Sequence, residues 1–454
     1  MEEGAKNGSH RNTRVGPEGA DYSPVVESAI RKGRRRLIPF LLLMYVAAFL
    51  DRVNVGFAKQ HLQDATGMSD AAFAFGASLF FVTYLIFEIP SNFGLARFGA
   101  KIWMCRIMVL WGLVSAAMMF VQGNTMFYVI RLLLGAAEAG FFPGVILFLT
   151  YWFPARKRVS MLGLFYFGAP LSFVLGGPVS GLLLQMDGVA GLAGWQWMFL
   201  LEGLFASAIG VWAYFYLDNG PADAAWLTPE EKTELSAVLA AEDADKLVHG
   251  SGSFLASLKD STVLRFIVIY ALMQMSIAIV VFYLPSQLGR LIGQTSGLGF
   301  GLMVAIPWAC ALVAVATVPA WSSKLGGSRF WGAASFVVAA IGMAGSASAN
   351  PIIAVASLCI AVAGLWAVQP IFWQTLTGYL GGVVAVAGIA LVNSLGNIGG
   401  FISPNVRIWA NDTFGSTSAG LYLLAGTTVL AAILMLTIRR EEAPVADPLR
   451  RLAV

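Results

Sequence analysis

Four charged residues lie inside long apolar stretches of the chain, and their types could act together. Asp51 and Arg52 are neighbours, whereas Arg131 and Glu138 are seven residues apart and share one face of a helix. The planar guanidinium of arginine can hold both oxygens of a carboxylate. Placing a charged group inside a membrane costs free energy, so each of these four residues is expected to have a partner or a function there. These residues predict a site for an anion and a proton.

The elements that position these charges must be membrane helices. Of 454 residues, 58% are hydrophobic and only 12% charged, whereas a soluble domain has about a quarter charged. About 20 apolar residues cross a bilayer as a helix, and lipid leaves no partners for an open backbone. We therefore expect an all-α membrane protein with twelve transmembrane helices in two six-helix bundles, the first six separated from the last six by the longest polar stretch.

The expected spans and regions have the following bounds. The spans lie near 37–58, 72–95, 102–122, 125–149, 159–185, 195–217, 264–288, 297–321, 330–349, 352–375, 383–406 and 417–438. The regions are a cytoplasmic, disordered N-terminal tail (1–36), an N-terminal bundle (37–217), a cytoplasmic linker (218–263), a C-terminal bundle (264–438) and a cytoplasmic C-terminal tail (439–454). Within the linker, Thr228 followed by Pro229 and Glu231 is typical of a helix start with a capping box.

Basic residues predict the orientation, because they gather in cytoplasmic loops. A cluster from Arg31 to Arg36 precedes the first span, and the loops expected inside carry most of the remaining lysines and arginines. We expect a multi-pass protein of a bacterial-type inner membrane with both termini in the cytoplasm. The basic residues at helix ends are explained by this orientation, so we expect no nucleic-acid partner.

Asp51 and Arg52 point about 100° apart on a helix, so one can face a central cavity while the other meets a neighbouring helix. A purely structural alternative is a salt bridge between helices, such as Asp51 with Arg131. In the functional alternative, the arginines bind the anion and a carboxylate takes the coupling proton. Glu138 is the better proton candidate, because it lies deep among small residues where burial favours the neutral carboxyl group.

The other intramembrane polar residues divide into two groups. Glu88 is expected to make a structural or gating contact, by pairing with Arg97 or Arg106, and Glu202 to be structural. The second half offers amides and aromatics, for which interhelical hydrogen bonds are the default: Tyr270, Gln274, Tyr283, Gln369, Trp373, Gln374, Asn393, Ser394 and Asn397. Asn393 and Asn397 share a face of a glycine-rich helix, so a role in a site or gate is equally open to them.

Other classes of chemistry find little support. The three cysteines show no paired spacing, the three histidines (His10, His61 and His249) fall outside the apolar runs, and no phosphate-binding GxxxxGK[ST] motif is present. We therefore expect no metal and no cofactor, with the proton gradient as driving force. An ATP-driven pump is disfavoured because the sequence lacks this phosphate-binding motif.

Several motifs together resemble the major facilitator superfamily, and within it the anion:cation symporters of the tartrate, phthalate and sugar-acid permease type. They are the segments 50–56, 88–92, 131–144, 151–154 and 393–400, and the resemblance covers residues 37–440. It implies proton-driven uptake of an organic anion by alternating access.

The resemblance also implies roles for single residues. It makes Arg52 a contact of the substrate carboxylate and gives Asp51 and Glu138 the proton coupling, with Arg131 in the same network. Tyr84 and Asn393 follow more weakly, and Gln274 and Gln369 complete our substrate-binding set. Glu88, Arg97 and Asn397 are assigned to gating or structure.

Two departures from the family pattern are visible. The loop after the second span lacks the acidic residue of the usual gate motif, and the fifth span is apolar and aromatic around Ala169 and Pro170. Such a wall favours an aromatic acid or short dicarboxylate over a polyhydroxylated sugar acid.

We thus expect a transporter and no enzyme: a proton symporter for a small organic anion, with the anion, the proton and the lipid bilayer as partners, acting as a monomer. Gly177-Pro178 in the fifth span has packing as its default interpretation, but it also occurs in drug antiporters. An exporter or exchanger therefore stays open as an alternative. A non-transporting receptor or sensor is a different class, which would normally carry a soluble output domain.

Overall fold

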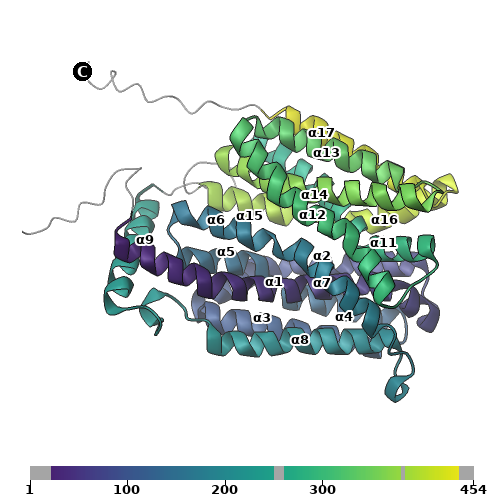
Figure 1. Cartoon of the computed structure of the whole chain (residues 1–454), viewed down its shortest axis with the longest axis horizontal. Coiled ribbons are helices and arrows are strands. Elements are labelled where there is room, and N and C mark those ends of the chain that lie inside the picture. The colour runs from purple at the N-terminus through teal and green to yellow at the C-terminus, as the bar shows by residue number, and fades with distance from the viewer. Residues whose placement is uncertain (1–21, 250–259, 380–383, 439–454) are drawn as a thin grey trace, which may run out of the picture.

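The computed structural model describes residues 22–249, 260–379 and 384–438, and in these ranges the regular structure is helical. Most helices run side by side along one direction (Figure 1). The first half contains α1 (Pro24–Thr66), α2 (Asp70–Phe98), α3 (Ala100–Ala116), η1 (Ala117–Phe120), α4 (Asn124–Glu138), α5 (Phe141–Trp152), α6 (Ala155–Tyr166), α7 (Gly168–Leu183), η2 (Val189–Gly191) and α8 (Gly194–Tyr216). The linker contains η3 (Pro221–Asp223) and α9 (Pro229–His249). The second half contains α11 (Ser261–Ile292), α12 (Leu298–Leu325), α13 (Ser328–Gly345), α14 (Pro351–Tyr379), α15 (Val384–Gly396), α16 (Ile398–Phe414) and α17 (Ala419–Leu436).

The two halves form separate bundles that lie against each other, the purple-to-teal half below and the green-to-yellow half above in Figure 1. Ten helical segments of the described chain are long and apolar enough to cross a membrane. The other two predicted spans correspond to α13 and to the pair α15 and α16. This arrangement agrees with the predicted fold class of twelve spans in two bundles.

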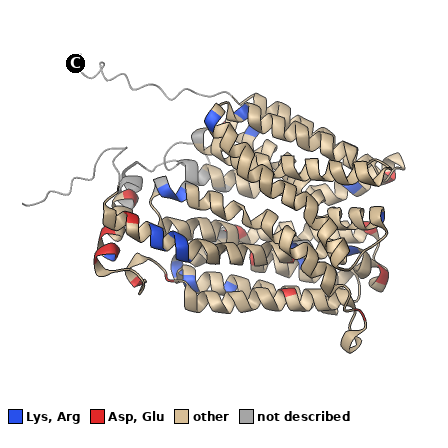
Figure 2. Cartoon of the chain, viewed as in Figure 1, with Lys and Arg blue, Asp and Glu red and all other residues tan. Residues whose placement is uncertain are grey.

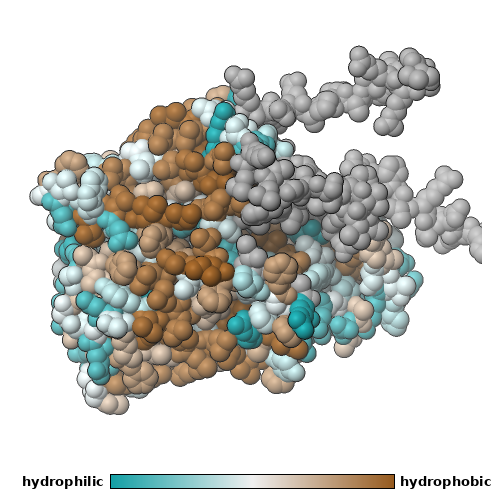
Figure 3. All heavy atoms as spheres, turned by 180° about the vertical axis from the view of Figure 1, so that it is seen from behind, coloured by the Kyte–Doolittle hydropathy of each residue, from teal (hydrophilic) through white to brown (hydrophobic). Residues whose placement is uncertain are grey.

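The surface of the bundles is suited to lipid. Large apolar side chains such as Phe93, Phe215 and Ile352 are exposed along the helices, and a brown apolar belt covers much of the face in Figure 3. Most Lys, Arg, Asp and Glu residues lie at or near the helix ends (Figure 2). We call the end of the molecule that carries α9 the linker side, and the opposite end the far side.

The prediction of a disordered tail over residues 1–36 is partly wrong, because the first helix begins at Pro24 instead of Leu37. Ser23 caps this helix by accepting from the Val26 amide at 3.2 Å, and proline suits the first helical turn. Lys32 in this extension forms a 2.8 Å ion pair with Glu231 of α9, which anchors the extension on the linker. Residues 1–21 and 439–454, and with them the remaining tail predictions and His10, lie outside the described residues.

The predicted capping box of the linker helix is confirmed. The Glu231 amide donates to the Thr228 hydroxyl at 3.2 Å, and the Glu231 carboxylate accepts from the Thr228 amide at 2.9 Å. The two bonds satisfy amide groups that the first turn of α9 leaves unpaired.

Three predicted continuous spans each consist of two shorter helices. The fourth is interrupted at Ala139 and Gly140, the fifth at Phe167 and the eleventh at Asn397. Gly140 has a left-handed φ of 88°, and a Cβ there would lie 2.2 Å from the Ser91 hydroxyl oxygen, so only glycine fits. The break makes Glu138 the last residue of α4. Broken helices are the usual lining of transporter sites.

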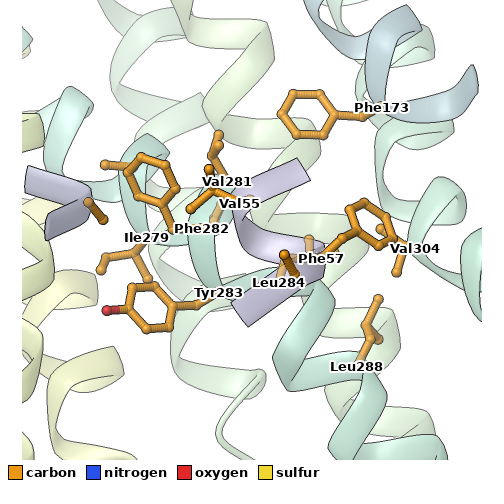
Figure 4. Packing of buried hydrophobic residues seen from close by; sticks show 14 of the residues in the cluster. Val55, Phe57, Phe173, Ile279, Val281, Phe282, Tyr283, Leu284, Leu288 and Val304 are labelled. Atoms are coloured by element: carbon orange, nitrogen blue, oxygen red, sulfur yellow. The ribbon is translucent and has the colours of Figure 1, made fainter. Parts of the chain in front are cut away.

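The two bundles pack tightly on the far side. The Gly297 amide of the second half donates to the Gly181 carbonyl of the first at 2.7 Å, and a Cβ on Gly177 would lie 2.6 Å from the Gly301 carbonyl oxygen. An apolar cluster fills the same interface and includes Phe57 of α1 and Leu284 and Leu288 of α11 (Figure 4); the centre of the Phe57 ring lies 5.6 Å from the centre of the Phe300 ring of α12. The Gly177-Pro178 element therefore has the packing role expected as its default.

Candidate functional site

A cavity of about 120 Å³ lies between the two bundles, near the helix breaks. It is lined from the first half by α1, α2, α4, α5 and the α6–α7 region, and from the second by α11, α12, α14, α15 and Asn397. The following predicted site residues line it: Arg52, Tyr84, Arg131, Glu138, Gln274, Gln369, Asn393 and Asn397. The structure thus brings together eight residues from six of the predicted spans. Asp51, Glu88 and Arg97 are not part of its wall.

Arg52 and Glu138 form an ion pair at the wall of this cavity. The Arg52 Nε donates to Glu138 Oε1 at 2.7 Å, and Nη2 contacts the same oxygen. The Arg52 side chain keeps 28% exposure, whereas Glu138 keeps 1%. A guanidinium has five N–H donors, so this pair leaves donors of Arg52 available to a molecule in the cavity.

Arg131 lies deeper, and its side chain is almost fully buried. One terminal nitrogen donates to the Ala77 carbonyl at 3.1 Å, and the guanidinium lies 4.9 Å from the centre of the Phe80 ring. Its Nε has no hydrogen-bond partner. A buried cation held by a carbonyl and an aromatic face, with a donor to spare, is suited to an anionic ligand.

Asp51 points away from the cavity, as the 100° separation from Arg52 allows. It accepts from the Asn54 side-chain amide at 3.1 Å and from the Ser115 hydroxyl of α3. The Asp51–Arg131 pair named in the structural alternative is wrong, because among the described residues these two side chains form no ion pair within 4.0 Å. Ser115 and Asn54 offer Asp51 nearer donors. A salt bridge between helices is nevertheless present, between Arg52 of α1 and Glu138 of α4.

The second half contributes hydrogen-bonded amides. The Tyr270 hydroxyl donates to Asn393 Oδ1 at 3.2 Å, and the Gln274 amide donates to Asn397 Oδ1 at 2.8 Å. These are the interhelical bonds expected by default, yet all four side chains also line the cavity. They present a polar, uncharged wall opposite the arginines.

Glu88 joins the two bundles beside the cavity. It accepts from the Asn393 amide at 2.8 Å and from the Ser394 hydroxyl at 3.0 Å. The expected pairing with Arg97 or Arg106 is therefore wrong, because both arginines lie at aromatic rings nearer the linker side. A contact between α2 and α15 fits the gating assignment of Glu88, whereas Arg97 is exposed and away from the site.

Sequence reasoning missed most aromatic residues of the wall, among them Tyr45, Phe49 and Trp366. Tyr45 and Phe49 precede Arg52 by seven and three residues, so helical spacing places all three on one face; that spacing could have found them. Trp366 on α14 gave no such signal. In the fifth span, Tyr166 and Ala169 line the cavity as the expected apolar and aromatic wall.

Residues 41–404 match the family described as Major Facilitator Superfamily. The chain belongs to this superfamily. It is 42% identical to the inner membrane transport protein RhmT of Escherichia coli (strain K12), over 91% of this chain and 96% of that protein. It is also 42% identical to a putative tartrate transporter of Agrobacterium vitis, over 91% of each chain.

Solved structures of the superfamily share the fold. The xylose transporter XylE from E. coli, in a partially occluded inward open conformation, superposes with a TM-score of 0.70, at 15% identity over 90% of this chain and all of that one. At this identity the likeness concerns the fold alone. Family and fold together make the chain a multi-pass membrane transporter and no enzyme, as predicted.

Proposed function

We propose that this superfamily member is a proton-coupled symporter, which carries a small organic carboxylate into the cell across the inner membrane by alternating access. The observation that carries the proposal is the ion pair between Arg52 and Glu138 at the cavity wall. It joins the group best suited to hold a carboxylate with a group able to hold a proton.

The charge of the cavity supports an anion as substrate. Among the described lining residues, the charged ones are Arg52, Arg131 and Glu138. With Glu138 ionised, these three side chains carry a net charge of +1. With Glu138 protonated, their net charge is +2. A monocarboxylate or dicarboxylate compensates this net charge, and arginine binds such a carboxylate with two parallel hydrogen bonds.

The size of the cavity supports a small substrate. The cavity has a volume of about 120 Å³, and one water molecule needs about 10–15 Å³ on the same measure. The space therefore suits a ligand of roughly ten non-hydrogen atoms, about the size of a four-carbon dicarboxylate. The aromatic wall of Tyr45, Phe49 and Tyr166 covers the carbon skeleton, and the amides of the second half offer partners to hydroxyl groups. The 42% identity to a putative tartrate transporter points to the same class.

Coupling follows from competition for one arginine. A substrate carboxylate that takes up the donors of Arg52 weakens the hold on Glu138. A buried carboxylate that loses its cation is unstable as an ion and is stabilised by a proton. Anion and proton therefore bind together, and release of the proton restores the ion pair and expels the anion.

The direction of transport rests on the orientation. With the linker side in the cytoplasm, as the basic residues predict, the far-side packing closes the outer face in this conformation. The Glu88 contacts with Asn393 and Ser394 lie on the inner side of the cavity. Alternating access then requires the far-side packing to separate while the two bundles approach each other further on the inner side, where these Glu88 contacts are already formed.

Reconstituted uptake tests the proposal. Full-length protein in proteoliposomes is given radiolabelled tartrate, phthalate and sugar acids, with and without an imposed inward proton gradient. We expect the gradient to accelerate and concentrate at least one carboxylate. If no carboxylate responds, symport is refuted; efflux or one-for-one exchange that ignores the gradient would instead establish the exporter or exchanger alternative.

A further inference from the structure

A second group of buried polar residues lies behind the cavity wall, in the first half alone. Glu202 of α8 is 4% exposed and accepts from the Ser180 hydroxyl of α7 at 2.7 Å. The Asn54 side chain lies between it and Asp51: the amide donates to Asp51 and also interacts with Glu202. None of these residues lines the cavity.

Glu202 has no cation partner in the described part of the chain. The helices packed against α8 are α1, α3, α7 and η1. Facing Glu202 they contribute one titratable group, Asp51 of α1, and the hydroxyl of Ser180; α3 contributes Ser115, which bonds Asp51. No lysine or arginine described lies within 4.0 Å of either carboxyl group. Among the described residues, neither of these two carboxyl groups therefore has a directly ion-paired lysine or arginine.

Three oxygens of this group lack hydrogen-bond partners: Glu202 Oε2, Asn54 Oδ1 and Asp51 Oδ2. Buried polar atoms are rarely left unpaired. If both carboxyls are ionised, all three atoms are acceptors and no donor exists for any of them. A proton on Glu202 removes the charge repulsion with Asp51 and makes one Glu202 oxygen a donor, while the Asn54 N–H continues to donate to Asp51.

We propose that Glu202 is a second proton-binding carboxyl group, linked through Asn54 to Asp51. The inference deepens the proposed symport and rests on it for its role in transport. While Asp51 is charged, Glu202 keeps its proton; when Asp51 is neutralised, the repulsion falls and Glu202 can release its proton to water. Asp51 is in turn within electrostatic range of Glu138 and Arg131. The protonation state of Glu202 therefore affects the charged residues that line the cavity.

The position of Glu202 suits exchange with the far side. It lies eight residues after the start of α8 at Gly194, which places it about 12 Å below that helix end. Protons that enter from the outer face, under the orientation proposed above, meet this group before the ion pair in the cavity.

Infrared difference spectroscopy of the full-length protein tests proton binding directly. We expect the unaltered protein to show the C=O band of a protonated carboxyl group at neutral pH, and Glu202→Gln to lack it. Glu230→Gln, which alters an exposed carboxyl of α9, should leave the band in place. If the spectrum of Glu202→Gln keeps every protonated-carboxyl band, the proposal is overturned.

Transport of tartrate, or of whichever carboxylate the uptake panel identifies, tests the coupling. We expect Glu202→Gln to retain exchange at symmetric pH but to shift the pH profile of proton-driven accumulation, and Glu202→Asp to restore it. An unshifted profile would mean a permanently held proton and would overturn the coupling. Failure of the unaltered protein to respond to a gradient refutes the symport proposal, whereas the infrared comparison still decides whether Glu202 binds a proton.

Misfolding of Glu202→Gln would also remove the band, so a second variant keeps the carboxyl group of Glu202. Ser180→Ala removes the hydroxyl that donates to Glu202. The carboxylic acid band should then move to higher frequency, because one hydrogen bond to the carboxyl group is lost. A band that does not move belongs to another residue and contradicts the assignment.

Discussion

Arg52 of α1 and Glu138, the last residue of α4, share an ion pair in which two guanidinium nitrogens contact one carboxylate oxygen. The other oxygen, Oε2, has no partner. Glu138 also ends a helix, where the negative end of the helix dipole lies. Arg52 is therefore the only described hydrogen-bond partner of the carboxylate, and any ligand that draws Arg52 away destabilises its charge.

Replacing Glu138 by Gln should separate proton coupling from substrate movement. The amide imitates the protonated carboxyl in shape but cannot release a proton. We expect accumulation driven by a pH gradient to be lost, while exchange of preloaded carboxylate stays measurable. Both rates are read in the same proteoliposomes. Wild-type accumulation in this variant would remove Glu138 from the coupling mechanism.

Replacing Arg52 by Lys should weaken substrate binding. The ammonium group keeps the charge but lacks the fork that holds two carboxylate oxygens. Loss of one charged hydrogen bond of about 1.5–3 kcal/mol corresponds to a rise in KM of roughly tenfold or more. Initial uptake rates against carboxylate concentration measure it, and Arg106→Lys, outside the cavity, is the matched control. An unchanged KM would mean that Arg52 does not contact the substrate.

Much of the site could be predicted because charge inside a membrane is rare and therefore informative. Arg52, Arg131 and Glu138 were found by that criterion alone, and helical geometry correctly separated Arg52 from Asp51. Apolar length and the basic loops were enough for the spans. These signals come from the lipid and water around the chain, which act on each segment independently of its neighbours, so they can be read from each segment alone.

Pairings between distant segments could not be predicted. The partner of Glu88 is on α15, about 300 residues away along the chain, and several arginines nearer in sequence were equally plausible partners. The break after Glu138 places Gly140, with a φ of 88°, so close to the Ser91 side chain that a Cβ would not fit, and this proximity is visible only in three dimensions. The start of α1 at Pro24 depends on its packing against α9, because the polar sequence alone resembles a disordered tail.

Substituting Gly177 by Val should hinder closure of the far side. A Cβ at this position would meet the Gly301 carbonyl oxygen of α12 at 2.6 Å, so a branched side chain forces α7 and α12 apart. We expect slower net transport and greater labelling of cysteines introduced near Gly301 by a reagent added from the far side. Gly163→Val is the control, because a Cβ there meets nothing within 4 Å. Equal labelling of the two variants would show that this packing does not close the far side.

The α1 extension should lose its anchor on the linker at low pH. Burial acts to raise the pKa of Glu231, but hydrogen bonds from Lys32, the Thr228 amide and Ser28 outweigh it and lower the pKa to about 2. The ordinary glutamate pKa is about 4.3. A lowered pKa in the folded state contributes stability that is complete above about 4.3 and is lost as the pH falls towards about 2.

Thermal unfolding of the unaltered protein and Glu231→Gln, followed from neutral to acidic pH, measures this contribution. Lys32 is 43% exposed, so solvent screening limits the pair to about 0.2–1 kcal/mol. We expect the unaltered protein to unfold at a slightly higher temperature near neutral pH. The difference should shrink as the pH falls from about 4.3 towards about 2, because the carboxyl group takes up a proton in the unfolded chain before it does so in the folded one. Glu230→Gln, at an exposed neighbour, should show no such difference. A gap between the curves that persists unchanged into the acid range would mean that Glu231 stabilises the linker through its shape and capping bonds instead of its charge.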